Sequence, residues 1–60
     1  MFELHFKGAE GRYEIVHLYC ADTEIITRLR RLPAAQAATT IDVQRDGLLL
    51  FTLAQSPSVP

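Results

Sequence analysis

The sequence predicts an α+β fold in which two β-hairpins flank one α-helix (ββαββ) and form a four-stranded antiparallel sheet with the helix packed on one face. Three observations lead to this prediction. Residues 2–7 alternate strictly between apolar and polar side chains, which is the period of a half-buried strand. Only residues 21–32 have clear helical periodicity. Two glycine-ended segments, 8–11 and 45–47, separate strand-like runs and are typical of hairpin loops.

The first predicted hairpin pairs residues 2–7 with residues 13–20. A three-residue loop of Ala9, Glu10 and Gly11 puts Gly11 at a left-handed position, which glycine adopts without steric cost. In this register Leu4 faces Val16 and Phe2 faces Leu18. The side chains that then share the helix-facing side are Phe2, Leu4, Phe6, Val16, Leu18 and Cys20.

The predicted helix at residues 21–32 has one apolar face, formed by Ile25, Ile26, Leu29 and Leu32. Asp22 or Thr23 is expected to cap its first turn with a side-chain oxygen. Pro33 ends the helix because its ring disfavours helical dihedrals at the preceding residue. We interpret residues 34–38 as a connector, with an extra helical turn as the alternative.

The second predicted hairpin pairs residues 39–44 with residues 48–53. A three-residue loop at 45–47 aligns Val43 with Leu49 and Ile41 with Phe51. The inner side is then formed by Ile41, Val43, Leu49, Phe51 and Leu53, and Leu48 and Leu50 point away from the helix. A two-residue turn at Asp46 and Gly47 is the alternative, ranked lower because it sets Asp42 opposite Phe51 and mixes the faces.

The helix returns the chain across the sheet, so the second and third strands run in the same direction. They cannot be neighbours in a fully antiparallel sheet. The spatial orders 2-1-3-4 and 1-2-4-3 both satisfy this condition, and the sequence does not choose between them.

Length and composition limit the chain to one domain, residues 1–54, followed by a flexible tail at 55–60 that is poor in apolar residues and contains two prolines. The single cysteine cannot form an intramolecular disulfide, so oligomerisation or a partner is expected to supplement a modest core. No apolar run of about 18 residues and no signal-like amino terminus is present. We expect a soluble, cytoplasmic protein with no membrane partner.

Few residues offer catalytic or metal chemistry. His5 and His17 are diagonal neighbours on one face with Glu3 nearby, but zinc usually takes four ligands and Cys20 falls on the opposite face. The same separation argues against Cys20 and His17 as a nucleophile and base. We therefore expect a protein that is not an enzyme, with no catalytic or metal site, no cofactor and no small-molecule substrate.

The face of the sheet away from the helix has more apolar and aromatic side chains than a solvated face normally has. The candidate interface residues are Tyr13, Ile15, His17, Tyr19, Leu48 and Leu50. They predict a small non-enzymatic protein–protein interaction module, either homodimeric through its sheet or acting as a regulator or inhibitor of a larger protein, of bacterial or phage type.

The alternative function is nucleic-acid binding through Arg28, Arg30 and Arg31, which lie on or beside the exposed side of the predicted helix. The formal net charge of −1 gives no overall attraction to phosphate. The arginines also have a structural explanation, because they lie toward the negative end of the helix dipole and Glu24 precedes Arg28 by one turn.

Overall fold

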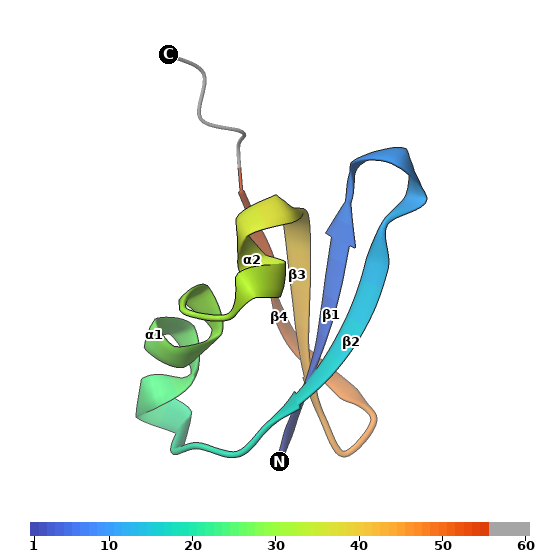
Figure 1. Cartoon of the computed structure of the whole chain (residues 1–60). Coiled ribbons are helices and arrows are strands. Elements are labelled where there is room, and N and C mark those ends of the chain that lie inside the picture. The colour runs from blue at the N-terminus through green and yellow to red at the C-terminus, as the bar shows by residue number, and fades with distance from the viewer. Residues whose placement is uncertain (56–60) are drawn as a thin grey trace.

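The structure is a computed structural model that describes residues 1–55. It contains four strands and two short α-helices in the order of two strands, two helices and two strands (Figure 1). Their bounds are β1 Phe2–Gly8, β2 Tyr13–Leu18, α1 Ile25–Arg30, α2 Pro33–Ala37, β3 Ala38–Arg45 and β4 Leu48–Ala54. The α+β class and the four-stranded antiparallel sheet are thus confirmed.

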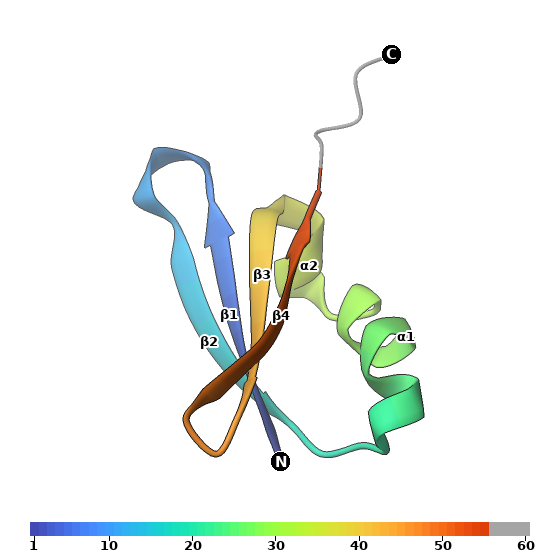
Figure 2. The ribbon, with the colours of Figure 1, turned by 180° about the vertical axis from the view of Figure 1, so that it is seen from behind.

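The sheet has the order β2-β1-β3-β4, which is one of the two orders that the sequence left open. All three strand pairs are antiparallel, so β2 and β3 run in the same direction on either side of β1. β2 and β4 are therefore the two edges. Both helices lie on one side of this twisted sheet (Figures 1 and 2).

The first hairpin has the predicted register, with Leu4 opposite Val16 and Phe2 opposite Leu18. The loop also has the predicted length, because the Gly8 N–H donates to the Arg12 carbonyl at 2.9 Å. Gly11 has the expected positive φ of 76°, and Glu10 joins it in the left-handed region with φ of 61°.

The prediction of one continuous helix at 21–32 is wrong. Residues Asp22–Glu24 form a 3-10 turn, α1 extends only from Ile25 to Arg30, and Leu32 is extended with ψ of 139°. Pro33 ends this helix as expected but also begins α2, because proline is well suited to the first turn of a helix. The connector interpretation of 34–38 is therefore also wrong, and the alternative of an extra helical turn is correct.

The capping prediction fails as well, because no side chain caps α1 or the preceding turn. Asp22 instead accepts a hydrogen bond from Arg45 at the end of β3, with 2.7 Å between Arg45 Nη1 and Asp22 Oδ1. The Arg45 guanidinium also lies 5.4 Å from the centre of the Phe2 ring. The Arg45–Asp22 hydrogen bond thus connects the start of the helical layer to the end of β3.

In the second hairpin the structure contains the two-residue turn that we ranked lower. Asp46 and Gly47 both have positive φ, and Arg45 pairs directly with Leu48. A register shift between Val43 and Gln44 then restores the match of faces, so that Val43 faces Phe51 and Ile41 faces Leu53. The predicted alignments of Val43 with Leu49 and of Ile41 with Phe51 are therefore wrong. The mixing of faces that ranked the two-residue turn lower does not occur either, because the bulge adds one residue to β4.

The core lies between the sheet and the helical layer. Phe2, Leu4 and Phe6 from β1 are buried, as the alternation predicted, and Val16, Leu18 and Cys20 are partly buried against them. From the predicted apolar helix face, Ile25 and Leu29 are buried and Leu32 partly so, but Ile26 is exposed. The remaining buried residues are Ala35, Ala38, Ile41 and Val43.

At the end of β4, Gln55 is held against α2. Its backbone N–H donates to Thr39, and its side-chain amide donates to the carbonyls of Ala35 and Ala38 at 2.9 and 3.0 Å. The rest of the predicted tail, residues 56–60, lies outside the described residues. Within residues 1–55, no helix has the length and apolarity needed to cross a bilayer.

Candidate interaction surfaces

A polar network occupies the middle of the sheet face opposite the helices. His5, on β1, donates from Nε2 to the Glu3 carboxylate at 2.5 Å, and its Nδ1 forms a hydrogen bond with the Tyr13 hydroxyl. His17, on β2, contacts the same carboxylate at 3.4 Å. The rings of His5 and Tyr13 meet edge to face. The hydrogen bond from His5 holds the pKa of Glu3 below its ordinary value.

A second polar group lies beside this network, across β1, β3 and β4. Lys7 Nζ lies 3.0 Å from Asp42 Oδ2, and the Thr52 hydroxyl donates to Asp42 Oδ1 at 2.9 Å. The hydrogen bond from Lys7, assisted by Thr52, lowers the pKa of Asp42, and the same pairing raises the pKa of Lys7. The centre of this face is therefore occupied by partnered polar side chains.

The six predicted interface residues do not form one continuous patch. Tyr13, Ile15 and His17 are exposed on β2, Tyr19 follows directly after it with 76% of its surface exposed, and Leu48 and Leu50 lie on β4. Since β2 and β4 are opposite edges of the sheet, β1 and β3 lie between the two groups. Sequence analysis predicted that all six share one face, and it could not show their separation because the strand order was open.

The leucines of β4 differ from their predicted positions. Cross-strand pairing puts Leu48 on the face of Arg45, which reaches toward the helical layer, and Leu49 on the face of Gln44 and Glu3. The prediction had these two faces exchanged, because it lacked the bulge. Leu49 is 57% exposed and does not belong to the core. It is therefore an exposed apolar residue, like Leu48 and Leu50, but sequence analysis had placed it on the inner side.

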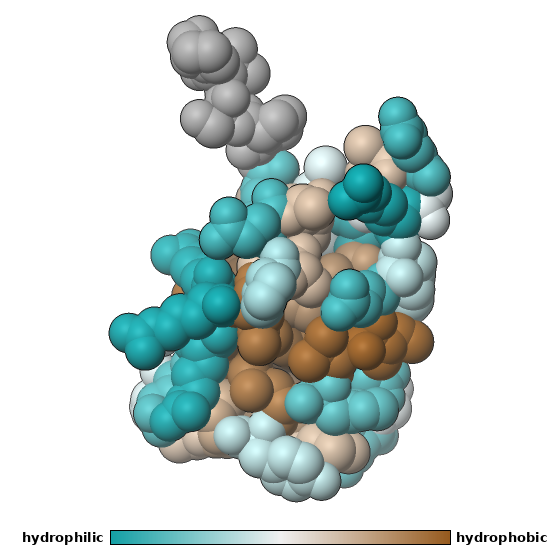
Figure 3. Space-filling model, viewed as in Figure 1, coloured by the Kyte–Doolittle hydropathy of each residue, from teal (hydrophilic) through white to brown (hydrophobic). Residues whose placement is uncertain are grey.

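On the helix side of the sheet, β2 is only partly covered, because Val16 and Leu18 are half-buried and Glu14 is exposed. Two overlapping depressions of about 290 and 470 Å³ lie between β2 and α2, and another of about 460 Å³ lies between Leu18 and α1. We call the first two the α2–β2 groove, which is lined by Phe6, Gly8, Arg12, Tyr13, Glu14, Val16, Leu32, Pro33, Ala34 and Ala37. Figure 3 shows hydrophobic side chains exposed between the helical layer and β2.

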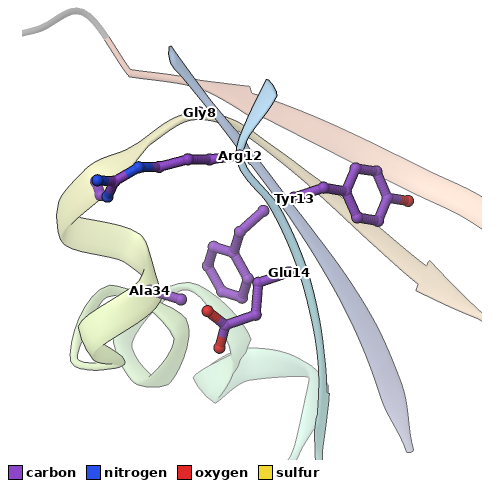
Figure 4. Close-up of a pocket in the computed structure, with 7 residues that line it drawn as sticks. Gly8, Arg12, Tyr13, Glu14 and Ala34 are labelled. Carbon is purple, nitrogen blue, oxygen red and sulfur yellow. The ribbon is translucent and has the colours of Figure 1, made fainter. Parts of the chain in front are cut away.

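Arg12 and Glu14 border this groove and were not among the predicted site residues. In Figure 4 the Arg12 side chain extends over the groove toward α2, the Glu14 carboxylate lies at its other side, and the Tyr13 ring points away from it. The signal was present in the predicted register, which sets Glu14 opposite Phe6. A charged residue on the inner face of an edge strand indicates that no helix covers that strand.

The arginines of the alternative function lie at the other end of the helical layer, and all three are exposed. Arg28 forms the predicted contact with Glu24, with 3.2 Å between Nη2 and Oε2. Arg28 and Arg31 border the depression next to Leu18. One of the three positive charges is therefore partly neutralised by a neighbour on the same helix.

Cys20 is partly buried against the core, whereas His17 lies on the opposite face with its side chain half exposed, as the sequence indicated. The two residues therefore do not come together. His5, His17 and Glu3 do meet, but within residues 1–55 no group of three or more His, Cys, Asp or Glu side chains has an arrangement suited to a metal ion.

Comparisons of the chain with protein-family models, with curated proteins and with solved structures found no match.

Proposed function

We propose that this chain is a small non-enzymatic interaction module that associates with another protein chain through the β2 edge of its sheet. The observation that carries this proposal is the exposure of β2 on both sides. On one side Tyr13 and Ile15 are about half exposed, and on the other the helical layer leaves the groove next to Val16 open. An edge strand exposed in this way offers both apolar area and unpaired backbone groups.

The magnitude of the effect supports an interface. Covering about 300 Å² of apolar surface at about 25 cal/mol per Å² contributes about 7 kcal/mol before the costs of association. This is similar to the whole free energy of unfolding expected for 60 residues, about 3–9 kcal/mol. Association would therefore have a large effect on the stability of so small a domain.

The partner is either a second copy of the chain or a larger protein that the module regulates or inhibits. Light scattering from micromolar to millimolar concentration, binding of a hydrophobic dye and a pull-down with the tagged chain test the proposal. We expect an assembly larger than the monomer, or capture of a partner that a Tyr13→Asp, Ile15→Asp variant fails to capture. A strict monomer without dye binding and without such a partner would disprove the proposal.

A further inference from the structure

The two edges of the sheet differ in how open they are to pairing. The β3–β4 pair contains a bulge next to Leu49 and Leu50, and a bulge is one of the devices that blunt an edge strand. The β1–β2 pair has six consecutive partners without a register shift, and β2 contains no proline. β2 is therefore the regular edge that a further strand can extend.

The free backbone groups of β2 follow from its pairing with β1. The Gly8 N–H donates to the Arg12 carbonyl, and hydrogen-bonded positions alternate along an antiparallel pair. Glu14 and Val16 consequently direct their N–H and C=O groups toward β1, whereas Tyr13, Ile15 and His17 direct theirs away from the sheet. These three residues are also exposed. One edge thus combines the unpaired backbone groups with the exposed side chains.

We propose that the occupant of this edge is a second copy of the chain, whose β2 pairs antiparallel across a twofold axis at Ile15. This proposal rests on the proposed function and specifies its partner. Ile15 then faces the partner's Ile15, and Tyr13 faces the partner's His17 on both sides of the axis. All three outward residues of each copy form backbone hydrogen bonds, which gives about six bonds across the interface.

Neighbouring registers are less favourable. An axis at Glu14 sets two like charges directly opposite each other, which is destabilising. An axis at Val16 moves Tyr13 onto the partner's Tyr19, which lies beyond the end of β2 at Leu18. Only the axis at Ile15 keeps every bonded pair within the strand and places two identical apolar side chains at the centre.

The interface area predicts a weak dimer. Pairing engages about ten residues of each copy, and standard interfaces bury about 800 Å² from 20–30 residues of each partner. By this proportion each copy buries about 300–400 Å², at most about half of the standard area. Interfaces of this size belong to weak, transient complexes, so we expect the β2 edges to pair reversibly as concentration changes.

Sedimentation equilibrium of matched variants tests this pairing. Ile15→Lys places two positive charges opposite each other on the axis and changes only an exposed side chain of the monomer. We therefore expect the dissociation constant of the dimer to rise at least tenfold. Leu50→Lys makes the same kind of change on the other edge strand, and we expect its dissociation constant to stay within twofold of wild type. Circular dichroism verifies that both variants are folded.

A cross-linking experiment provides an independent readout. In a Cys20→Ser background, Ile15→Cys should form a disulfide-linked dimer under mild oxidation, because the two Cα atoms would lie about 5.5 Å apart. The matched Leu50→Cys variant should remain mostly monomeric.

Two results would overturn the pairing. A wild-type dimer that Leu50→Lys weakens as much as Ile15→Lys would show that the β2 pairing is wrong, although the chain would still be an interaction module. A wild type that is monomeric up to 1 mM and an Ile15→Cys variant that does not cross-link would overturn self-association. The proposed function would then still be tested by whether a foreign partner is lost on charging Tyr13 and Ile15.

Discussion

Gly8 provides a sharp test of how the helical layer is seated on the sheet. It ends β1 where α2 passes over it, and a Cβ at this position would lie only 2.8 Å from the Ala37 carbonyl oxygen. Gly8→Ala therefore forces that carbonyl to retreat by about 0.6 Å to reach the 3.4 Å at which ordinary contact begins. Since this carbonyl belongs to the last residue of α2, the substitution pushes the end of the helix away from β1.

The expected cost follows from two opposing effects. Overpacking of this kind typically costs about 1–3 kcal/mol. Gly8 itself has φ of −130°, which alanine adopts without strain, so the loss of freedom in the unfolded chain returns about 0.4–1 kcal/mol. We expect a net destabilisation of about 1–2 kcal/mol, which corresponds to a fall in Tm of roughly 5–15 °C for a domain of this size.

Urea denaturation of wild type and Gly8→Ala measures this difference. Gly11→Ala is the control for loop strain, because Gly11 has a positive φ but a Cβ added there would meet no atom within 4 Å. Gly11→Ala should lower the free energy of unfolding by about 1 kcal/mol without displacing α2. The amide chemical shifts of α2 should therefore change in Gly8→Ala but not in Gly11→Ala. A Gly8→Ala protein that is more stable than wild type by about 0.4–1 kcal/mol would refute the close approach of α2 to β1.

Three further predictions follow from the core, the polar face and the helix. Leu29→Ala should lower the free energy of unfolding by about 2–5 kcal/mol because Leu29 is fully buried, whereas Ile26→Ala should cost less than about 1 kcal/mol; equal losses in urea titrations would contradict the structure. The pKa of Asp42 is lowered in the folded state, so its contribution to stability is present above a pH of about 3.8 and is lost as pH falls through the folded pKa. Asp42→Asn should therefore flatten the acid decline of the free energy of unfolding measured in urea titrations. An unchanged pH dependence would argue against the pairing with Lys7. If the alternative function is correct, replacing Arg28, Arg30 and Arg31 with glutamine should abolish salt-dependent binding of a labelled duplex or single strand, and no binding by wild type at low salt would exclude it.

The first hairpin was predictable in detail because two independent signals agree. The alternation in residues 2–7 fixes which side chains are buried, and the loop ending at Gly11 fixes the register. Either signal alone leaves a choice of register. Their agreement placed Leu4 opposite Val16 correctly.

The second hairpin misled the prediction because its two signals conflict. Asp46 and Gly47 favour a two-residue turn, whereas the apolar pattern requires Val43 to share a face with Phe51. The chain satisfies both by adding a bulge in β4, and a pattern of three consecutive leucines does not reveal which of them is the extra residue. The position of Leu49 could not be predicted for this reason.

The helical segment shows a similar limit. Pro33 correctly marked the end of one helix, but proline is equally favourable at the first position of the next. The prediction of the candidate interface was limited for another reason, because the strand order was open. Its residues were identified as exposed, but only the strand order shows that Ile15 and Leu50 occupy opposite edges, with His5 and Asp42 between them.

Amide hydrogen exchange at different protein concentrations tests the central claim most directly. The Ile15 N–H points away from β1, so it should exchange rapidly in dilute protein and become protected at several hundred micromolar as β2 pairs with a second copy. Thr52 provides an internal reference on the opposite edge strand. The Gln55 N–H points inward and donates to Thr39, and because N–H directions alternate along a strand, the Thr52 N–H should point outward. Protection that rises with concentration at Ile15 but not at Thr52 is the predicted result. Rapid exchange of Ile15 at every concentration would contradict self-association through β2.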